Sequence, residues 1–356
     1  MFLLCLYLCG PVGRISGRNV KCVKVDVNVK LQQYFLVVVI LAIFSSSLSA
    51  QNAGATTVAK WKDDKDCAFI LMFDDNSSTH VKNVIPELSK RGYTGTFYIC
   101  PGTGHYKVNK KFWEETVVKG GFELANHTLS HKGGATEKAV LLEIDACTEA
   151  IRQMTPQMPW PRLLSWGKPG GLKQGMWPIG EKEEYKKMLV EKNLVLRPDF
   201  GGRGGNIAFK TGPQMIAHLD KAIKNNAMEC IIFHGVGGDW ISVSFEAFKE
   251  LLDGIQKRQD KVWLTQHVAA HQYAVERDSA EVKVTKSSAS QISLSLTSKA
   301  DAKFYYHPLT LKTQVPAGWQ KCKVSQGSKA VEVTVKDGSI MYDAVPGAES
   351  ITITKK

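Results

Sequence analysis

The 356-residue sequence lacks the features that define several classes of protein. Gly (30) and Pro (13) are too few for a collagen-like or low-complexity chain, and no internal repeat is apparent. No basic run alternates with aromatic residues, so a nucleic-acid partner has little support. No apolar run reaches the roughly 20 residues that a membrane-spanning helix needs. With 44% hydrophobic and 22% charged residues, the composition is that of a folded protein.

The cysteines lack the number and spacing of a disulfide framework. Three of the eight cysteines lie in the first 50 residues, and the five others are widely spaced and form no CxxC pair. An odd number at such spacing argues against a disulfide framework. Cys67, Cys100 and Cys230 lie in apolar runs, where cysteine behaves as a small buried hydrophobe. A thiol nucleophile is therefore not expected either.

Residues 1–50 have the pattern of a leader. The apolar run Tyr34–Phe44 follows several lysines and precedes small residues up to Ala50. This order predicts a signal peptide and secretion, to the extracellular space or the periplasm, with an uncleaved anchor as the alternative. Residues 51–356 hold 41 Lys and Arg against 33 Asp and Glu, a net charge of +8. A moderate positive charge favours acidic surfaces such as anionic polymers.

Short apolar runs alternate with amphipathic stretches from residue 66 to about residue 278. The runs are mostly continuous rather than alternating, as expected of parallel strands buried on both faces. The predicted strands are Cys67–Phe73, Gly95–Cys100, Phe122–Ala125, Arg162–Trp166, Leu194–Pro198, Met228–Phe233 and Val262–Thr265. The predicted helices are Thr79–Arg91, Asn109–Lys119, Thr136–Met154, Glu181–Lys192, Pro213–Asn225 and Ser244–Arg258. Seven strands that alternate with helices predict an α/β protein with a (β/α) barrel over residues 63–278.

The pattern changes after residue 278. Residues 280–356 contain short alternating strands separated by Gly and Pro turns, and Asp337-Gly338 indicates a hairpin. We expect a small all-β domain that braces the barrel or takes part in ligand binding. Residues 51–62 are expected to form a linker between the leader and the barrel.

Polar residues follow several predicted strands at the rim where barrel enzymes place their active sites. Asp74 and Asp75 follow the first strand, His127 and His131 the third, and His234 the sixth. Two histidines four residues apart lie on one face if they share a helical turn. One carboxylate and two histidines make a three-ligand site with positions left for water and substrate, as in catalytic zinc sites.

The adjacent aspartates are expected to have different roles, because neighbouring side chains at a strand end point in different directions. One carboxylate would bind the metal, and the other would act as general base towards water that the metal activates. His234 would act as general acid. Each residue also has a structural alternative, a turn or helix cap for the aspartates and simple packing for His234.

The motifs FDDN, NHTLSH and IIFHG, in this order and on these strands, resemble those of the polysaccharide deacetylases, the NodB-homology domain of carbohydrate esterase family 4. The resemblance covers about residues 63–275. It implies a distorted (β/α)7 barrel, and metal-dependent hydrolysis of N- or O-acetyl groups on a polysaccharide or oligosaccharide. The implied cofactor is Zn²⁺, or another divalent metal such as Co²⁺ or Ni²⁺.

The resemblance also implies residue roles. Asp74 would be the catalytic base and His234 the catalytic acid, and Asp75, His127 and His131 would bind the metal. Asn76 replaces the usual glycine after the aspartate pair, a mild change because asparagine tolerates left-handed backbone.

The family's third motif, Arg-x-Pro-aromatic-Gly, corresponds here to residues 167–171, GKPGG. The arginine that pairs with the base and the aromatic groove residue are therefore missing. We expect Arg203 to approach the base in its place, and the Gly170 N–H to serve as an oxyanion donor. Trp166 and Trp240 are candidates for contact with substrate.

The favoured interpretation is a secreted, metal-dependent carbohydrate deacetylase. The alternatives are a metal-dependent amidase that acts on a non-sugar substrate, and a catalytically inactive carbohydrate-binding protein.

Overall fold

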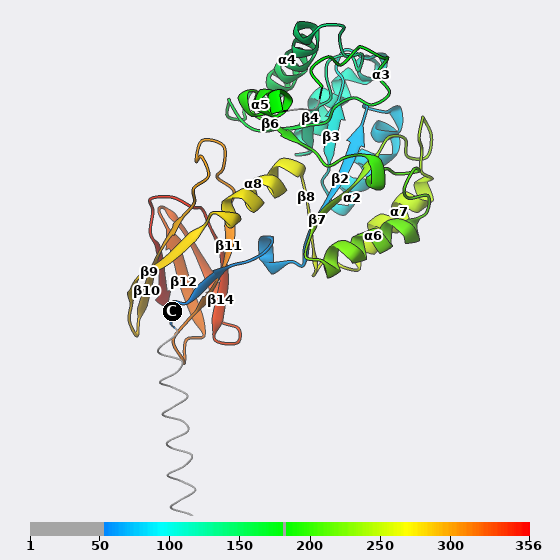
Figure 1. Cartoon of the computed structure of the whole chain (residues 1–356). Coiled ribbons are helices and arrows are strands. Elements are labelled where there is room, and N and C mark those ends of the chain that lie inside the picture. The colour runs from blue at the N-terminus through cyan, green and yellow to red at the C-terminus, as the bar shows by residue number, and fades with distance from the viewer. Residues whose placement is uncertain (1–52, 181–182) are drawn as a thin grey trace, which may run out of the picture. The chain divides into compact units, whose positions relative to one another are not determined.

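The computed structural model describes residues 53–180 and 183–356. The predicted leader therefore lies outside the described residues. The described residues belong to one compact unit, whose strands and helices are shown in Figure 1. No helix in the described ranges combines the length and apolar character needed to cross a membrane.

Seven parallel strands form the first sheet, as the sequence predicts. They are β2 (Cys67–Asp74), β3 (Thr96–Ile99), β4 (Glu123–Asn126), β5 (Leu164–Trp166), β6 (Leu194–Leu196), β7 (Met228–Phe233) and β8 (Val262–Thr265). Six of them lie in the order β6-β5-β4-β3-β2-β7, and β8 pairs with the first half of β2. The segment after β6 reaches β7 through a hydrogen bond from Gly205 N to Ile232 O of 2.8 Å. The distorted (β/α)7 barrel is thus confirmed.

Helices separate successive strands and lie around the sheet (Figure 1). The α-helices are α2 (Ile85–Arg91), α3 (Gly104–Val108), α4 (Glu137–Met154), α5 (Glu183–Glu191), α6 (Gly212–Lys224), α7 (Phe245–Gln256) and α8 (His267–Asp278). Shorter helical segments cover His80–Val84, Phe112–Val117, Gly201–Arg203 and Lys62–Asp64. Thr136, Thr211 and Ser244 cap α4, α6 and α7, because each side chain accepts a backbone N–H of the first turn.

Every residue of β2 is buried, and its side chains alternate between two hydrophobic clusters. Phe69, Leu71 and Phe73 pack with residues of the surrounding helices in the first cluster, here called the outer cluster. Ile70 and Met72 belong to the second, the inner cluster, which also contains residues of α8 and of the C-terminal strands. Burial on both faces explains the continuous apolar runs in the sequence.

Two antiparallel sheets form the C-terminal part, which confirms the predicted all-β character. The strands are β9 (Glu281–Ser287), β10 (Gln291–Thr297), β11 (Leu309–Gln314), β12 (Lys321–Gln326), β13 (Lys329–Thr334), β14 (Ser339–Ala344) and β15 (Ile351–Lys355). One sheet has the order β13-β12-β15-β10-β9 and the other β1-β11-β14. β1 (Thr56–Val58) lies in the expected linker, which therefore contributes a strand to this part of the fold.

A buried carboxyl lies where α8 meets the C-terminal strands. Glu276 is 1% exposed, and one of its oxygens accepts the backbone N–H of His307 at 2.9 Å. Burial raises the pKa of Glu276 from its usual 4.5 to about 7. Between these two pH values the unfolded chain has released this proton and the folded chain retains it, so stability falls as pH rises through this window.

Glu276→Gln is therefore expected to raise the urea midpoint above that of the parent at pH 8 and to leave it unchanged at pH 4. The amide oxygen still accepts the His307 N–H, and no charge is buried. Glu281→Gln, on the exposed strand β9, is the control and should have little effect at either pH. Equal midpoints for Glu276→Gln and the parent at both pH values would contradict the assignment.

Candidate metal centre and active site

Alternation along the strands decides which side chains reach the barrel interior. Asp74 follows Met72 of the inner cluster by two residues, and His127 follows Ala125 of the same cluster by two residues. His234 follows Ile232 of this cluster by two residues, which places it on the inner face just beyond β7. Because the strands are parallel, their carboxyl ends meet at one rim of the barrel.

Asp75 reaches the same site by a different route. Strict alternation would place it on the outer face, but its backbone has a φ of 67°, and Asn76 follows with a φ of 46°. Asn76 holds this turn, since its Oδ1 accepts the Cys100 N–H at 2.7 Å and its Nδ2 donates to Thr103 at 3.1 Å. The expected tolerance of asparagine for left-handed backbone is confirmed at this position.

His131 lies in a loop, not on a helical turn. Thr128 and His131 have φ values of 66° and 61°, and residues 127–131 contain no helix. The loop is tied to α4, because Glu143 accepts both the Ser130 N–H at 2.7 Å and the Ser130 hydroxyl at 2.9 Å. The helical interpretation of the four-residue spacing is therefore wrong, although the two histidines do converge.

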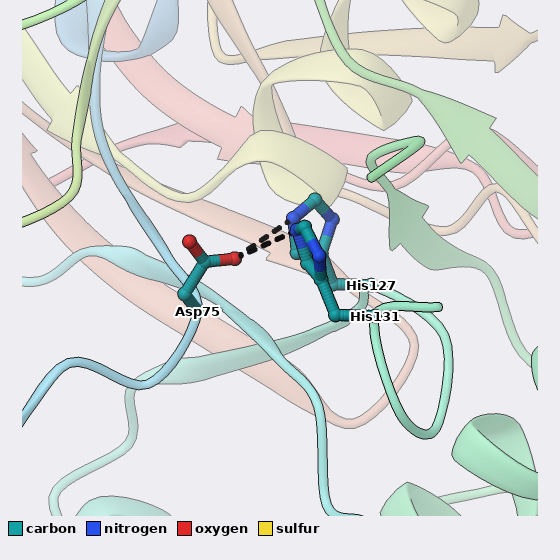
Figure 2. Close-up of side chains that lie close together, drawn as sticks. All are labelled: Asp75, His127 and His131. Atoms are coloured by element: carbon teal, nitrogen blue, oxygen red, sulfur yellow. Dashed lines mark ion pairs between the residues drawn. The ribbon is translucent and has the colours of Figure 1, made fainter. Parts of the chain in front are cut away.

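Asp75, His127 and His131 bring three ligand atoms together (Figure 2). Asp75 Oδ1 lies 3.3 Å from His127 Nε2 and 3.2 Å from His131 Nε2. This oxygen is buried and has no hydrogen-bond partner among the described residues. Ligand atoms of a tetrahedral zinc site lie about 3.3 Å apart, as follows from bond lengths near 2.0 Å. The donor set and its spacing therefore fit a divalent metal ion.

The orientation of His127 also suits metal binding. Its Nδ1–H donates to the Gly167 carbonyl at 2.6 Å, which leaves the lone pair of Nε2 directed at the site. Burial by itself would raise the pKa of Asp75, but hydrogen bonds and positive charge from His127 and His131, in their protonated forms, hold it below its usual value. The carboxylate is therefore ionised and available as a ligand.

Asp74 forms a buried ion pair with Arg197. Arg197 Nη2 donates to Asp74 Oδ2 at 2.8 Å, Nη1 donates to Oδ1, and the two residues are 9% and 2% exposed. Burial would raise the pKa of Asp74, but the charge of Arg197 outweighs it and holds the pKa below its usual value. The expected contact from Arg203 is wrong, because Arg203 pairs with Glu229 at 2.8 Å. Glu229 precedes Ile231 of the outer cluster by two residues and so lies on the opposite face.

Gly167 makes room for Arg197. A Cβ at position 167 would lie 2.7 Å from Arg197 Nε and 3.0 Å from the Tyr98 ring. The guanidinium also lies over this ring, 4.4 Å from its centroid. The family motif has its arginine at position 167, just after β5. In this chain the guanidinium that reaches Asp74 comes instead from Arg197, just after β6, the next strand along the chain. Leu194 belongs to the outer cluster, and Arg197 lies three residues further along, which places it on the inner face. This alternation was the signal that could have identified Arg197.

His234 completes the cluster. Its Nε2 lies 3.9 Å from Asp74 Oδ2 and 3.6 Å from Asp75 Oδ2. His80 Nε2 donates to the His234 carbonyl at 2.5 Å, and the Phe200 ring meets the imidazole edge-on with centroids 5.1 Å apart. His234 Nδ1 is buried without a hydrogen-bond partner in the described ranges. The imidazole is thus held by its backbone and by packing.

Three further residues were predicted to contact substrate or the oxyanion, and only one of them is seen to contact the site. Trp166 belongs to the outer cluster, and its indole donates to the Tyr185 hydroxyl at 2.5 Å, so the expected substrate contact is wrong. Trp240 lies at the site, where Nε1 donates to Asp75 Oδ2 at 3.0 Å. Gly170 lies in the exposed segment after β5, and its role as an oxyanion donor stays a prediction.

Residues 62–173 match the family model described as polysaccharide deacetylase, which confirms the resemblance. A gellan lyase of Bacillus sp. is 22% identical in an alignment of 339 positions that covers 85% of this chain. This chain spans only 13% of the length of that relative.

Solved structures with similarity to this chain include two described as deacetylases and one described as a CE4 family pseudoenzyme. The catalytic domain of a peptidoglycan N-acetylglucosamine deacetylase from Eubacterium rectale is 15% identical, with 59% of this chain and 96% of that chain covered and a TM-score of 0.42. A polysaccharide deacetylase from Bacillus cereus is 16% identical, with 56% and 92% covered and a TM-score of 0.41. A pseudoenzyme of carbohydrate esterase family 4 from Bacillus anthracis is 15% identical, with 56% and 63% covered and a TM-score of 0.39.

Arg197→Met is expected to lower the free energy of unfolding by about 3–5 kcal/mol, because it leaves the Asp74 carboxylate buried and unpaired. Arg203→Met is the matched control, since the same change there breaks a partly exposed pair and should cost about 1 kcal/mol or less. Urea denaturation of both variants provides the measurement. Equal losses would show that Arg197 is not the partner on which Asp74 depends.

Proposed function

We propose that the protein is a secreted, metal-dependent deacetylase that hydrolyses N- or O-acetyl groups on a polysaccharide or oligosaccharide. The observation that carries the proposal is Asp75 Oδ1, which is buried, has no hydrogen-bond partner within residues 53–180 and 183–356, and lies 3.3 and 3.2 Å from two imidazole nitrogens. A buried carboxylate oxygen without a partner is costly. A cation held between Asp75, His127 and His131 would remove that cost.

Two nitrogen donors and one oxygen donor suit Zn²⁺, and Co²⁺ or Ni²⁺ accept the same ligands. Such an ion, when bound, polarises the acetyl carbonyl and makes a water molecule more acidic. Three protein ligands leave room in the coordination shell for substrate, as in catalytic rather than structural sites.

Asp74 is the proposed general base. The two N–H groups of Arg197 keep its carboxylate ionised and fix its orientation, while Oδ2 remains 3.9 Å from His234 Nε2. In hydrolysis, the water oxygen forms a bond to the acetyl carbon as Asp74 takes a water proton. The bond from this carbon to the sugar nitrogen or oxygen then breaks, and His234 supplies the proton that the leaving atom needs.

The proposed partner is an acetylated carbohydrate polymer or its fragments. The match to the polysaccharide deacetylase family supports this class of substrate, and the net charge of +8 over residues 51–356 suits an anionic polymer or cell wall. The leader-like pattern of residues 1–50 supports secretion.

Asp74→Asn and Asp75→Ala should separate base from ligand. Asp74→Asn is expected to retain the metal and to lower kcat for acetate release by about 10²–10⁴-fold, because the base is lost. Asp75→Ala should lose the metal on gel filtration. Metal analysis and acetate release from chitooligosaccharide, acetylated xylan and peptidoglycan provide the measurements, with circular dichroism to check folding. An unchanged kcat in Asp74→Asn would show that Asp74 is not the base.

Removal of metal tests the class of reaction. Treatment of the purified parent protein with a chelator should abolish acetate release, and Zn²⁺ added after dialysis should restore it. Binding of the polymer by the metal-loaded protein without any acetate release would favour the inactive carbohydrate-binding alternative. Activity on small formamides or ureides, but on none of the acetylated carbohydrates, would favour the non-sugar amidase.

A further inference from the structure

The loop that follows His234 has an unusual backbone. Gly237, Gly238, Asp239 and Ile241 have φ values of 73°, 148°, 63° and 45°. Glycine adopts such angles readily, but a β-branched isoleucine does so only against a steric cost. Backbone of this kind persists where surrounding contacts determine it, and such positions cluster at functional sites. The contacts of this loop therefore indicate what it holds in place.

The loop is bound to the segment that carries the aspartate pair. Asp239 Oδ2 accepts the Thr79 N–H at 2.9 Å and also the Ser77 hydroxyl. Within the loop, Gly235 N donates to the Trp240 carbonyl at 3.0 Å. These bonds fix the backbone of Trp240 relative to Asp75, which lies only a few residues before Ser77 in the chain.

The indole of Trp240 contacts the proposed metal ligand directly. Its Nε1–H donates to Asp75 Oδ2 at 3.0 Å, and its ring lies beside the His105 ring with centroids 4.9 Å apart. The two oxygens of Asp75 therefore have separate surroundings. Oδ1 faces His127 and His131, while Oδ2 receives the indole N–H and lies 3.6 Å from His234 Nε2.

We propose that Trp240 is a positioning residue of the metal centre, whose N–H holds Asp75 so that only Oδ1 is presented to the ion. This inference rests on the proposed function. A carboxylate free of the indole can rotate, bind through both oxygens, or bring Oδ2, already 3.6 Å from His234 Nε2, into a direct hydrogen bond with the proposed acid. Groups that hydrogen-bond to metal ligands orient them, and their loss typically costs about 10–100-fold in metal affinity or activity.

Trp240→Phe tests the proposal, because phenylalanine retains an aromatic ring and loses the N–H. We expect Zn²⁺ loaded into this variant to transfer to a chromogenic chelator about 10–100-fold faster than from the parent protein. Trp319→Phe is the matched control. It removes an indole hydrogen bond to a backbone carbonyl, Ala289 O at 3.1 Å, in the C-terminal sheets, and should leave metal release unchanged.

A second variant distinguishes loss of the positioning contact from a general folding defect. Asp239→Asn weakens the hydrogen bonds that hold the loop to Ser77 and Thr79, but it retains Trp240 and its N–H. It should therefore speed metal release by a smaller factor than Trp240→Phe, with a parent-like circular dichroism spectrum. Parent-like metal release in Trp240→Phe would overturn the proposal. If Trp240→Ala then raised KM, the ring would be assigned to stacking on sugar.

The two proposals fail in different ways. If the parent protein binds no Zn²⁺, or binds it and releases no acetate, the proposed function is at fault. If the parent protein binds Zn²⁺ and hydrolyses acetyl groups while Trp240→Phe retains the metal equally well, only the positioning role of Trp240 is overturned.

Discussion

Side chains on the parallel strands alternate between two buried faces, and the whole site depends on this alternation. The outer face of each strand packs under the helices, and the inner face fills the barrel. The polar residue that follows the last inner hydrophobe therefore emerges at the rim, next to its equivalents from neighbouring strands. Asp74, His127 and His234 all reach the site by this step, from strands far apart in the sequence.

The ion pair of Asp74 and Arg197 shows that the end of a different strand can supply the arginine that pairs with the proposed base. An inner position at the end of one strand, residue 167, has no side chain, and the inner position at the end of the next strand carries the guanidinium. The two positions are coupled by volume, because even a Cβ at residue 167 would collide with Arg197. A missing motif residue therefore does not mean a missing charge, since the neighbouring strand supplies it at the same place.

The proposed metal ligands are positioned in two ways, by the end of a strand and by turns that hydrogen bonds hold. His127 lies at a strand end, and a hydrogen bond to the Gly167 carbonyl determines its tautomer. Asp75 and His131 lie in turns with positive φ, which hydrogen bonds from neighbouring segments hold. Trp240 adds a contact from a third segment to Asp75. The rigid sheet thus brings the groups near one another, and the loops determine the final direction of each donor atom.

The sequence by itself determined the strands, the barrel and which strand ends carry chemistry, because burial on both faces leaves continuous apolar runs and their polar ends stand out. It also contained the alternation that places Arg197 inward and Trp166 and Glu229 outward, although Arg203 was the residue predicted to pair with Asp74. Only the tertiary structure decided how Asp75, His131 and Trp240 meet. Their directions depend on left-handed backbone and on hydrogen bonds between segments far apart in the chain, and no local periodicity encodes such contacts.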